Sequence, residues 1–417
     1  MNDLAGHINI GLTWDGAQWQ VATRSSRALT ASRVFAGKPL TEVARQIPLL
    51  YSVCSTAQSQ AFVSAAESIL NLTPPTSTQR ARHQCLQAEL IKEHLWRLLL
   101  DWPPLLDLPR EDARMAKIMA SWHALRTQLK LGAASELFIP GAHLTNPSTT
   151  NTNAGVETET GNTLRKLITL SEQATLGMSA TDWLTACNSL AQWRHWAEST
   201  PTPAAALARQ LHEQGLEALG QARTSLLTQP DLSAIEHHLS SANAEAFIAA
   251  PSLNGCCLET TPVARVATAP LITDLSHTYG RGLLTRFAAL LLELAQTLAG
   301  LASELELEAR HKVKPGTEPP QPTSIIRTKH TGPHSSLTAV QAARGLLIHR
   351  LVLHDHRVES HQVLAPTEWN FHPQGVLNQA LSELPPDNTS DRARLKQLAH
   401  LLITAIDPCV DYELTSA

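Results

Sequence analysis

The sequence predicts a predominantly helical α+β protein, and three features of its apolar pattern lead to that expectation. Apolar residues recur at helical spacing in several segments, of which residues 282–307 form the longest. Residues 7–22 alternate in polarity around Asp15-Gly16, a pattern typical of a β-hairpin. Residues 345–353 and 358–364 form a second pair of strand-like runs around a polar turn. We therefore expect long helices with small sheets beside them.

Composition narrows the class of protein. The 417 residues are 43% hydrophobic, enough for a large core, and the formal net charge of -4 gives no sign of a nucleic-acid partner. The six cysteines lack the spacing of a disulfide framework, which favours a reducing compartment. The N-terminus lacks the features of a signal peptide, and no apolar run approaches the length of a membrane span. We therefore expect a cytoplasmic protein without a membrane partner.

The helical segments follow one another along most of the chain. Trp102-Pro103-Pro104 is expected to stop the first long helix, because proline lacks the amide that would continue it. His94 within that helix is more typical of a core or interface histidine than of a metal ligand. The leucine-rich last helix is expected to be the central core helix of a bundle. The expected helices are residues 78–101, 110–131, 163–173, 180–198, 204–228 and 282–307.

Two segments interrupt this pattern. Residues 143–162 include a polar run of low complexity and are expected to form a flexible surface loop, without marking a domain boundary. Residues 309–334 are rich in proline and are expected to form a loop or linker.

Cys54 lies directly before an expected helix start. Ser55 and Thr56 are good N-cap residues, and the apolar residues that follow have helical spacing. The positive end of a helix dipole would favour the thiolate, which is the form that binds metals. A lone cysteine is more often buried and inert, so the argument depends on a second segment, Asp407-Pro408-Cys409, at the other end of the chain.

Together these two segments resemble the motifs of nickel–iron hydrogenase large subunits, in which four cysteines hold nickel and an iron that carries cyanide and carbon monoxide. Cys54 and Cys409 match two of those cysteines, while Tyr51 and Tyr412 stand in place of the other two. Two thiolates cannot reproduce the four-cysteine nickel site, so no nickel is expected. Other motif positions are also replaced: an arginine by Leu49, two histidines by Gln58 and Thr415, and a proton-relay glutamate by Ser32, a poor relay.

Three further stretches resemble the same family: residues 259–265, 340–345 and 365–370. The resemblance implies that Arg344, Pro366 and Thr367 would surround the cyanide ligands of the iron. A guanidinium and a hydroxyl can donate hydrogen bonds to anionic cyanide nitrogen, while apolar neighbours suit carbon monoxide. Outside this motif, Arg344 would be interpreted as a surface or ion-paired arginine.

Other histidines give a weaker signal. His354, His356 and His361 lie in or near an expected turn, and His237-His238 lie in a polar patch. A His-x-His pair can bind a metal, but the spacing supplies no third or fourth ligand. A solvated turn is therefore the simpler interpretation.

The family resemblance implies one hydrogenase large-subunit-like domain over residues 1–417, with long central helices and small peripheral sheets. The groups suited to iron are partly kept, whereas those for nickel, proton relay and C-terminal processing are lost. This pattern resembles the hydrogenase maturation proteins of the HupK and HoxV type. It implies a non-enzymatic scaffold that transiently carries the iron–dicyanide–carbonyl unit on Cys54 and Cys409. Its partners would be chaperones of the HypC and HypD type and the immature hydrogenase large subunit.

Some alternatives remain open at this stage. Cys409 matches a cysteine that binds only nickel in hydrogenases, so it would either move to the iron or serve in transfer. A metal-free docking protein would have Cys54 and Cys409 too far apart to share an ion. An enzyme with a different site is a third alternative, but the sequence shows no phosphate loop and no nucleophile motif.

Overall fold

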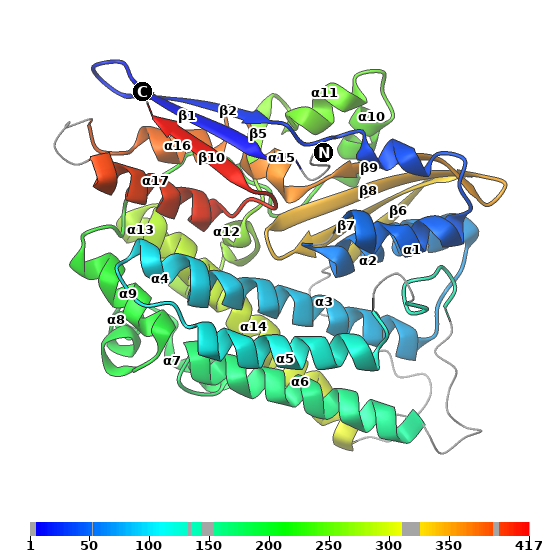
Figure 1. Cartoon of the computed structure of the whole chain (residues 1–417), viewed down its shortest axis with the longest axis horizontal. Coiled ribbons are helices and arrows are strands. Elements are labelled where there is room, and N and C mark those ends of the chain that lie inside the picture. Colours follow the sequence, from blue (N-terminus) through cyan, green and yellow to red (C-terminus); the bar gives the residue numbers. More distant parts are fainter. Residues whose placement is uncertain are drawn as a thin grey trace.

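The computed structural model describes residues 6–51, 53–131, 135–142, 153–310, 326–386 and 392–416. Long helices form one layer of the molecule, in which α3, α5, α6 and α14 run side by side (Figure 1). A four-stranded sheet lies across this layer and is covered by α2, which packs against β7 and β8. This architecture confirms the predicted helical α+β class.

The helices are α1 (Leu40–Leu50), α2 (Ser55–Leu70), α3 (Thr76–Trp96), α4 (Trp102–Leu105), α5 (Asp112–Gln128), α6 (Asn153–Thr175), α7 (Ala180–Ala186), α8 (Leu190–Ser199), α9 (Pro203–Glu213), α10 (Leu232–Leu239), α11 (Ala244–Ala249), α12 (Pro262–Val266), α13 (Pro270–Tyr279), α14 (Leu283–Arg310), α15 (Pro366–Asn370), α16 (Val376–Ser382) and α17 (Arg392–Ile406). A 3-10 helix, η1 (Ala31–Phe35), and a π-helical turn, η2 (Arg97–Asp101), complete the set.

The strands are β1 (Ile8–Trp14), β2 (Trp19–Ser25), β3 (Ser225–Leu226), β4 (Ser252–Leu253), β5 (Cys256–Glu259), β6 (Ile326–Gly332), β7 (Ser335–Ala342), β8 (Gly345–His354), β9 (Arg357–Leu364) and β10 (Tyr412–Ser416).

Helix α14 is the predicted core helix. Its residues Phe287, Leu291, Leu294, Leu298 and Leu301 are fully buried. Residues 283–307 are also long and apolar enough to cross a bilayer, so the expectation that no apolar run approaches that length is wrong. Core helices of soluble proteins can have the same length and apolar composition, and 78% of the apolar window of α14 is buried inside the structure. The apolar surface of α14 packs against neighbouring helices, including α3, α6, α12 and α13.

Both predicted hairpins are present. Strands β1 and β2 pair antiparallel, and β10 adds to them in parallel, with Ile8 opposite Tyr412, so that segments near both ends of the chain share one sheet. Strands β6, β7, β8 and β9 form an antiparallel sheet in that order. The β8–β9 turn has positive φ at Asp355 and His356, as the tight turns of hairpins require.

Several predicted helix boundaries were wrong, for identifiable reasons. The helical conformation does not end at Trp102. A π-helical turn leads from α3 into α4, whose first turn accepts proline because its amides need no helical partner. The helix expected over residues 180–198 is two helices, each beginning at a serine cap, Ser179 or Ser189. The helix expected over residues 204–228 ends at Glu213, just before Gly215, whose φ is +66°.

The predictions for the two loops are wrong at their flanks. Residues 143–152 and 311–325 lie outside the described residues. Helix α6 already begins at Asn153, and β6 already begins at Ile326, so the flanks of both predicted loops have regular structure.

Candidate functional site

The candidate site is built from four segments that are distant in the sequence. Tyr51 and Cys54 lie between α1 and α2, and Arg344 lies in the turn between β7 and β8. Thr367 lies in the first turn of α15, next to Pro366 at its start, and Cys409 lies between α17 and β10. The fold thus places all the predicted site residues around one region.

Cys54 is the N-cap residue of α2, and it packs against an apolar cluster that includes Ala57, Leu347, Val363 and Ala365. The side-chain amide of Gln58, one turn further along the helix, donates to the Cys54 sulfur over 3.5 Å. Cys54 therefore has apolar neighbours on one side and an N–H donor on its sulfur.

The expected stabilisation of a Cys54 thiolate by the helix dipole is wrong for this chain. Burial raises the pKa of Cys54 to about 12, and the nearby Cys409 and Glu89 add to the effect. The first amides of α2 already have a partner, because the N–H groups of Thr56 and Ala57 donate to the carboxyl group of the buried Glu89 over 2.8 and 3.0 Å. Cys54 is therefore a protonated thiol at neutral pH in the metal-free chain.

Cys409 occupies the same region from the other end of the chain. Its backbone N–H donates to the Thr367 hydroxyl oxygen over 3.2 Å. Burial raises the pKa of the Cys409 thiol, although the charges of Arg344 and Arg27 oppose that effect. Because a charge on Cys409 raises the pKa of Cys54, the two thiols are near enough to interact electrostatically.

Arg344 is buried and ion-paired. Its Nε donates to Asp407 Oδ1 over 2.9 Å, and its Nη1 lies 2.9 Å from Glu93 Oε2. Arg97 contacts the same Asp407 carboxylate over 2.7 Å, so the residue two positions before Cys409 is held by two guanidinium groups. No hydrogen bond of Arg344 Nη2 occurs within the described part of the chain. The guanidinium is therefore held at Nε and at Nη1, and among the described residues its Nη2 has no hydrogen-bond partner.

The remaining motif segments are joined to the Arg344 turn by hydrogen bonds and close packing. Asn370 at the end of α15 donates to the Arg344 carbonyl over 3.0 Å and accepts the Thr260 backbone N–H over 2.8 Å. Gly345 has a φ of +138°, and a Cβ at this position would lie 2.4 Å from Thr260 Oγ1. The three sequence stretches that resemble hydrogenase motifs are thus in direct contact.

Two residues of the site escaped the sequence analysis. Arg27 follows β2 and forms a buried ion pair with Glu368, and its charge acts on both Cys54 and Cys409. It lies in an irregular segment with no motif to mark it. Glu89 gave no signal either, because its partners are backbone amides of another helix.

The two tyrosines at cysteine positions behave differently. Burial raises the pKa of Tyr51, which interacts electrostatically with Arg27 and Cys54 and therefore belongs to the site as a neutral phenol. Tyr412 lies in β10, and its hydroxyl is 2.8 Å from His400 Nδ1. Of the two tyrosines, Tyr51 is thus the one that interacts with Cys54, whereas the Tyr412 hydroxyl has His400 as its partner.

The other candidate residues have structural roles. His94 is buried and lies 2.8 Å from Glu293, which confirms its interpretation as a core histidine. His354 and His356 are exposed on the β8–β9 turn, whereas His361 is buried. Ser32, at the proton-relay position, donates to the His361 carbonyl over 2.5 Å.

Within the described ranges, no group of three or more His, Cys, Asp or Glu side chains is arranged to hold a metal.

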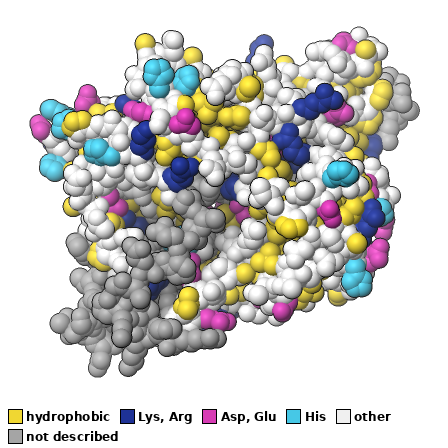
Figure 2. Space-filling model, turned by 180° about the vertical axis from the view of Figure 1, so that it is seen from behind, with side chains coloured by type: hydrophobic (Ala, Val, Ile, Leu, Met, Phe, Trp, Pro, Cys, Tyr) yellow, Lys and Arg dark blue, Asp and Glu magenta, His cyan; other side chains and the backbone are white. Residues whose placement is uncertain are grey.

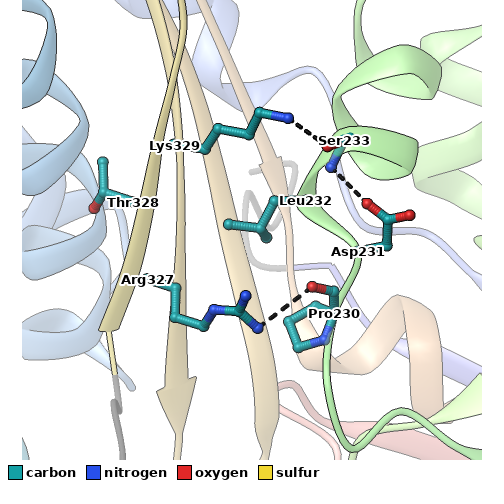
Figure 3. A pocket seen from close by; sticks show the side chains of 7 residues that line it. All are labelled: Pro230, Asp231, Leu232, Ser233, Arg327, Thr328 and Lys329. Carbon is teal, nitrogen blue, oxygen red and sulfur yellow. Dashed lines mark hydrogen bonds between the residues drawn. The ribbon is translucent and has the colours of Figure 1, made fainter.

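A separate open pocket lies between α10 and β6 (Figure 3). Its polar groups bind one another: Arg327 donates to the Pro230 carbonyl over 3.5 Å, and Asp231 accepts the Ser233 N–H. This pocket is therefore separate from the candidate site, whose donor groups are two thiols with a guanidinium and a hydroxyl beside them.

Curated relatives cover nearly all of the chain, although no protein-family model matches it. The hydrogenase expression/formation protein HupV of Azotobacter chroococcum is 27% identical over 99% of this chain and 98% of its own. HupK of Bradyrhizobium diazoefficiens is 29% identical over 94% and 91%, and HoxV of Cupriavidus necator is 25% identical over 94% and 91%.

Solved hydrogenase structures share the fold. The Ni-Fe-Se hydrogenase of D. vulgaris Hildenborough aligns with a TM-score of 0.59 and 14% identity over 95% of this chain and 94% of that one. An NAD+-reducing [NiFe]-hydrogenase aligns with a TM-score of 0.54 and 14% identity over 95% and 93%. The chain is therefore similar over nearly its whole length to the HupK, HupV and HoxV hydrogenase expression/formation proteins, and it has the fold of a hydrogenase large subunit.

Proposed function

We propose that this chain is a non-enzymatic assembly factor for nickel–iron hydrogenase that carries the iron–dicyanide–carbonyl unit as its cargo. Cys54 and Cys409 supply the thiolate ligands, and Arg344, Thr367 and the adjacent Pro366 line the side that receives the cyanides. The names of the relatives, as hydrogenase expression/formation proteins, support the general role. The observation that supports the specific role is that two partly buried cysteines from distant parts of the sequence lie near enough to interact electrostatically, with Arg344 beside both and Thr367 bound to the second.

The chemistry of the donor set suits such a cargo. Thiolate sulfur is a soft ligand for low-spin iron, and iron binding must displace the protons of both thiols. The free Nη2 of Arg344 can donate to one cyanide, and the Thr367 hydroxyl, whose oxygen accepts the Cys409 N–H, can donate its own proton to another. Two protein ligands leave the metal incompletely enclosed, which favours release over permanent binding.

The same geometry supports the absence of nickel. Tyr51 places a neutral phenol where a third thiolate would be needed, and Tyr412 is bound to His400. The proposed partners are chaperones of the HypC and HypD type, which would deliver the iron, and the immature large subunit, which would receive it. Both exchanges belong to the cytoplasm in this proposal.

The decisive experiment is infrared spectroscopy on protein purified anaerobically from cells that assemble the iron unit. Cyanide and carbonyl bands are expected for the native chain and should disappear in Cys54→Ala and Cys409→Ala. Cys256→Ser is the matched control, because Cys256 is exposed on β5 and should leave the bands unchanged. Absence of bands in the native protein, with iron at background, would refute the carrier role.

A metal-free docking protein is the second candidate. It is favoured by the raised pKa of both thiols, which keeps them protonated, and by the lack of a three-ligand cluster within the described residues. Its signature would be co-purification with an immature large subunit that persists in the Cys54→Ala, Cys409→Ala double variant.

A further inference from the structure

A line of buried hydrogen bonds leads away from the Cys54 sulfur. Gln58 Nε2 lies 3.5 Å from Cys54 Sγ, and Gln58 Oε1 lies 2.7 Å from His349 Nε2. His349 Nδ1 in turn lies 3.1 Å from His361 Nε2. Gln58, His349 and His361 are 2%, 0% and 5% exposed, so bulk water does not compete for these bonds. We call these three residues the polar chain.

The hydrogen positions of the polar chain follow from its chemistry. Burial lowers the pKa of His361 to about 3 and lowers that of His349 well below its usual value, so both imidazoles are neutral. A neutral imidazole has one donor and one acceptor. Because the Gln58 amide donates to sulfur, its oxygen accepts from His349 Nε2, and His349 Nδ1 then accepts from His361 Nε2.

The opposite orientation of the polar chain is disfavoured. If the Gln58 amide flipped, each imidazole would carry its proton on Nδ1 instead of Nε2. His361 Nδ1 is buried and has no hydrogen-bond partner among the described residues. The neighbouring rings of Phe35 and Phe62, 5.8 and 5.4 Å away between centroids, offer no oxygen or nitrogen acceptor. A buried N–H without an acceptor is costly, so the last imidazole selects the orientation of the first amide.

We propose that His349 and His361 are positioning residues that hold the Gln58 amide N–H on the Cys54 sulfur. None of the three touches the cargo; each acts through the next. A hydrogen bond to a ligating sulfur reduces the electron density that it donates to the metal, as do other outer contacts of metal ligands. The effect on iron rests on the proposed function, whereas the orientation of Gln58 is a property of the chain alone.

The metal-free protein provides the first test. Nitrogen-15 spectra of the imidazole rings should show the Nε2–H tautomer for both His349 and His361. At fixed neutral pH, Gln58→Leu and His349→Phe should slow the alkylation of Cys54 by iodoacetamide equally, by roughly threefold, because the lost hydrogen bond lowers the thiolate fraction about tenfold while the more basic thiolate is more nucleophilic. Gln60→Leu is the control, since Gln60 lies in the same helix and donates to Ser64.

Two results would overturn the proposal without reference to iron. One is an Nδ1–H tautomer or a protonated ring at either histidine. The other is an unchanged alkylation rate in His349→Phe beside a slowed rate in Gln58→Leu. If His349→Phe does not fold, His361→Phe replaces it, because its pocket already contains two phenylalanines.

The iron-loaded protein provides the second test. Gln58→Leu and His349→Phe should both move the carbonyl stretch to lower wavenumber, since a more electron-rich sulfur increases donation from iron to carbon monoxide. Equal shifts support the positioning role, and a shift confined to Gln58→Leu contradicts it. If the native protein shows no bands, the carrier role fails, and the metal-free experiments alone decide whether the polar chain orients Gln58.

Discussion

Acid should destabilise this fold through the two imidazoles of His349 and His361. Burial lowers the pKa of both, to about 3 for His361, so the folded chain keeps them neutral. In the unfolded chain each binds a proton below a pKa of about 6.5, and the depressed folded values mean that stability is lost as the pH falls through that value. Below about pH 6.5, each imidazole lowers the free energy of unfolding by about 1.4 kcal/mol per pH unit. Between pH 7.5 and 5.0 this amounts to about 2 kcal/mol for each histidine, a large part of an ordinary stability of roughly 5–15 kcal/mol.

The measurement is denaturant unfolding at both pH values for the native chain and for His361→Phe. The variant should lose about 2 kcal/mol less between pH 7.5 and 5.0 than the native chain does, because one of the two titrating groups is gone. Buried carboxyls such as Glu89 and Glu368 have raised pKa values and act in the opposite direction, so the difference between the two proteins carries the information. His354→Gln is the control, because His354 is exposed on the β8–β9 turn. An identical pH dependence in His361→Phe and the native chain would refute the reasoning.

Two further predictions concern the residues that hold the site together. Arg344→Ala should cost about 3–5 kcal/mol in denaturant unfolding, because it leaves the buried Asp407 and Glu93 carboxylates without their shared partner; a loss below about 1 kcal/mol would mean that Arg97 suffices. Gly345→Ala should lower the melting temperature, since φ is +138° and the new Cβ would approach Thr260 Oγ1 to 2.4 Å; adding Thr260→Ala should not restore it, because the Thr260 carbonyl oxygen remains 2.7 Å away.

On the face shown in Figure 2, lysine and arginine side chains are scattered among acidic, histidine and hydrophobic ones. This mixed distribution agrees with the formal net charge of -4. The charges with the greatest consequence are instead inside, where Arg27, Arg344 and Arg97 balance Glu368, Glu93 and Asp407 around the two thiols.

The fold class and the main elements could be predicted from the sequence alone, because they depend on local patterns. Helical periodicity located α14, and the alternation around Asp15-Gly16 located the β1–β2 hairpin. Cys54, Cys409, Arg344 and Thr367 were found only through short motifs that resemble hydrogenase large subunits. Helix ends were predicted poorly, since caps such as Ser179 and breaks such as Gly215 act within one turn.

What only the tertiary structure decided is the electrostatic state of the site. The start of α2 predicted a stabilised Cys54 thiolate, yet Glu89 from α3 takes the helix amides and burial raises the pKa of the thiol. The contacts of Gln58 with Cys54 and His349 likewise join residues that no local pattern connects. A pKa and a hydrogen-bond direction depend on which distant groups share a buried space, and that information exists only once the chain has folded.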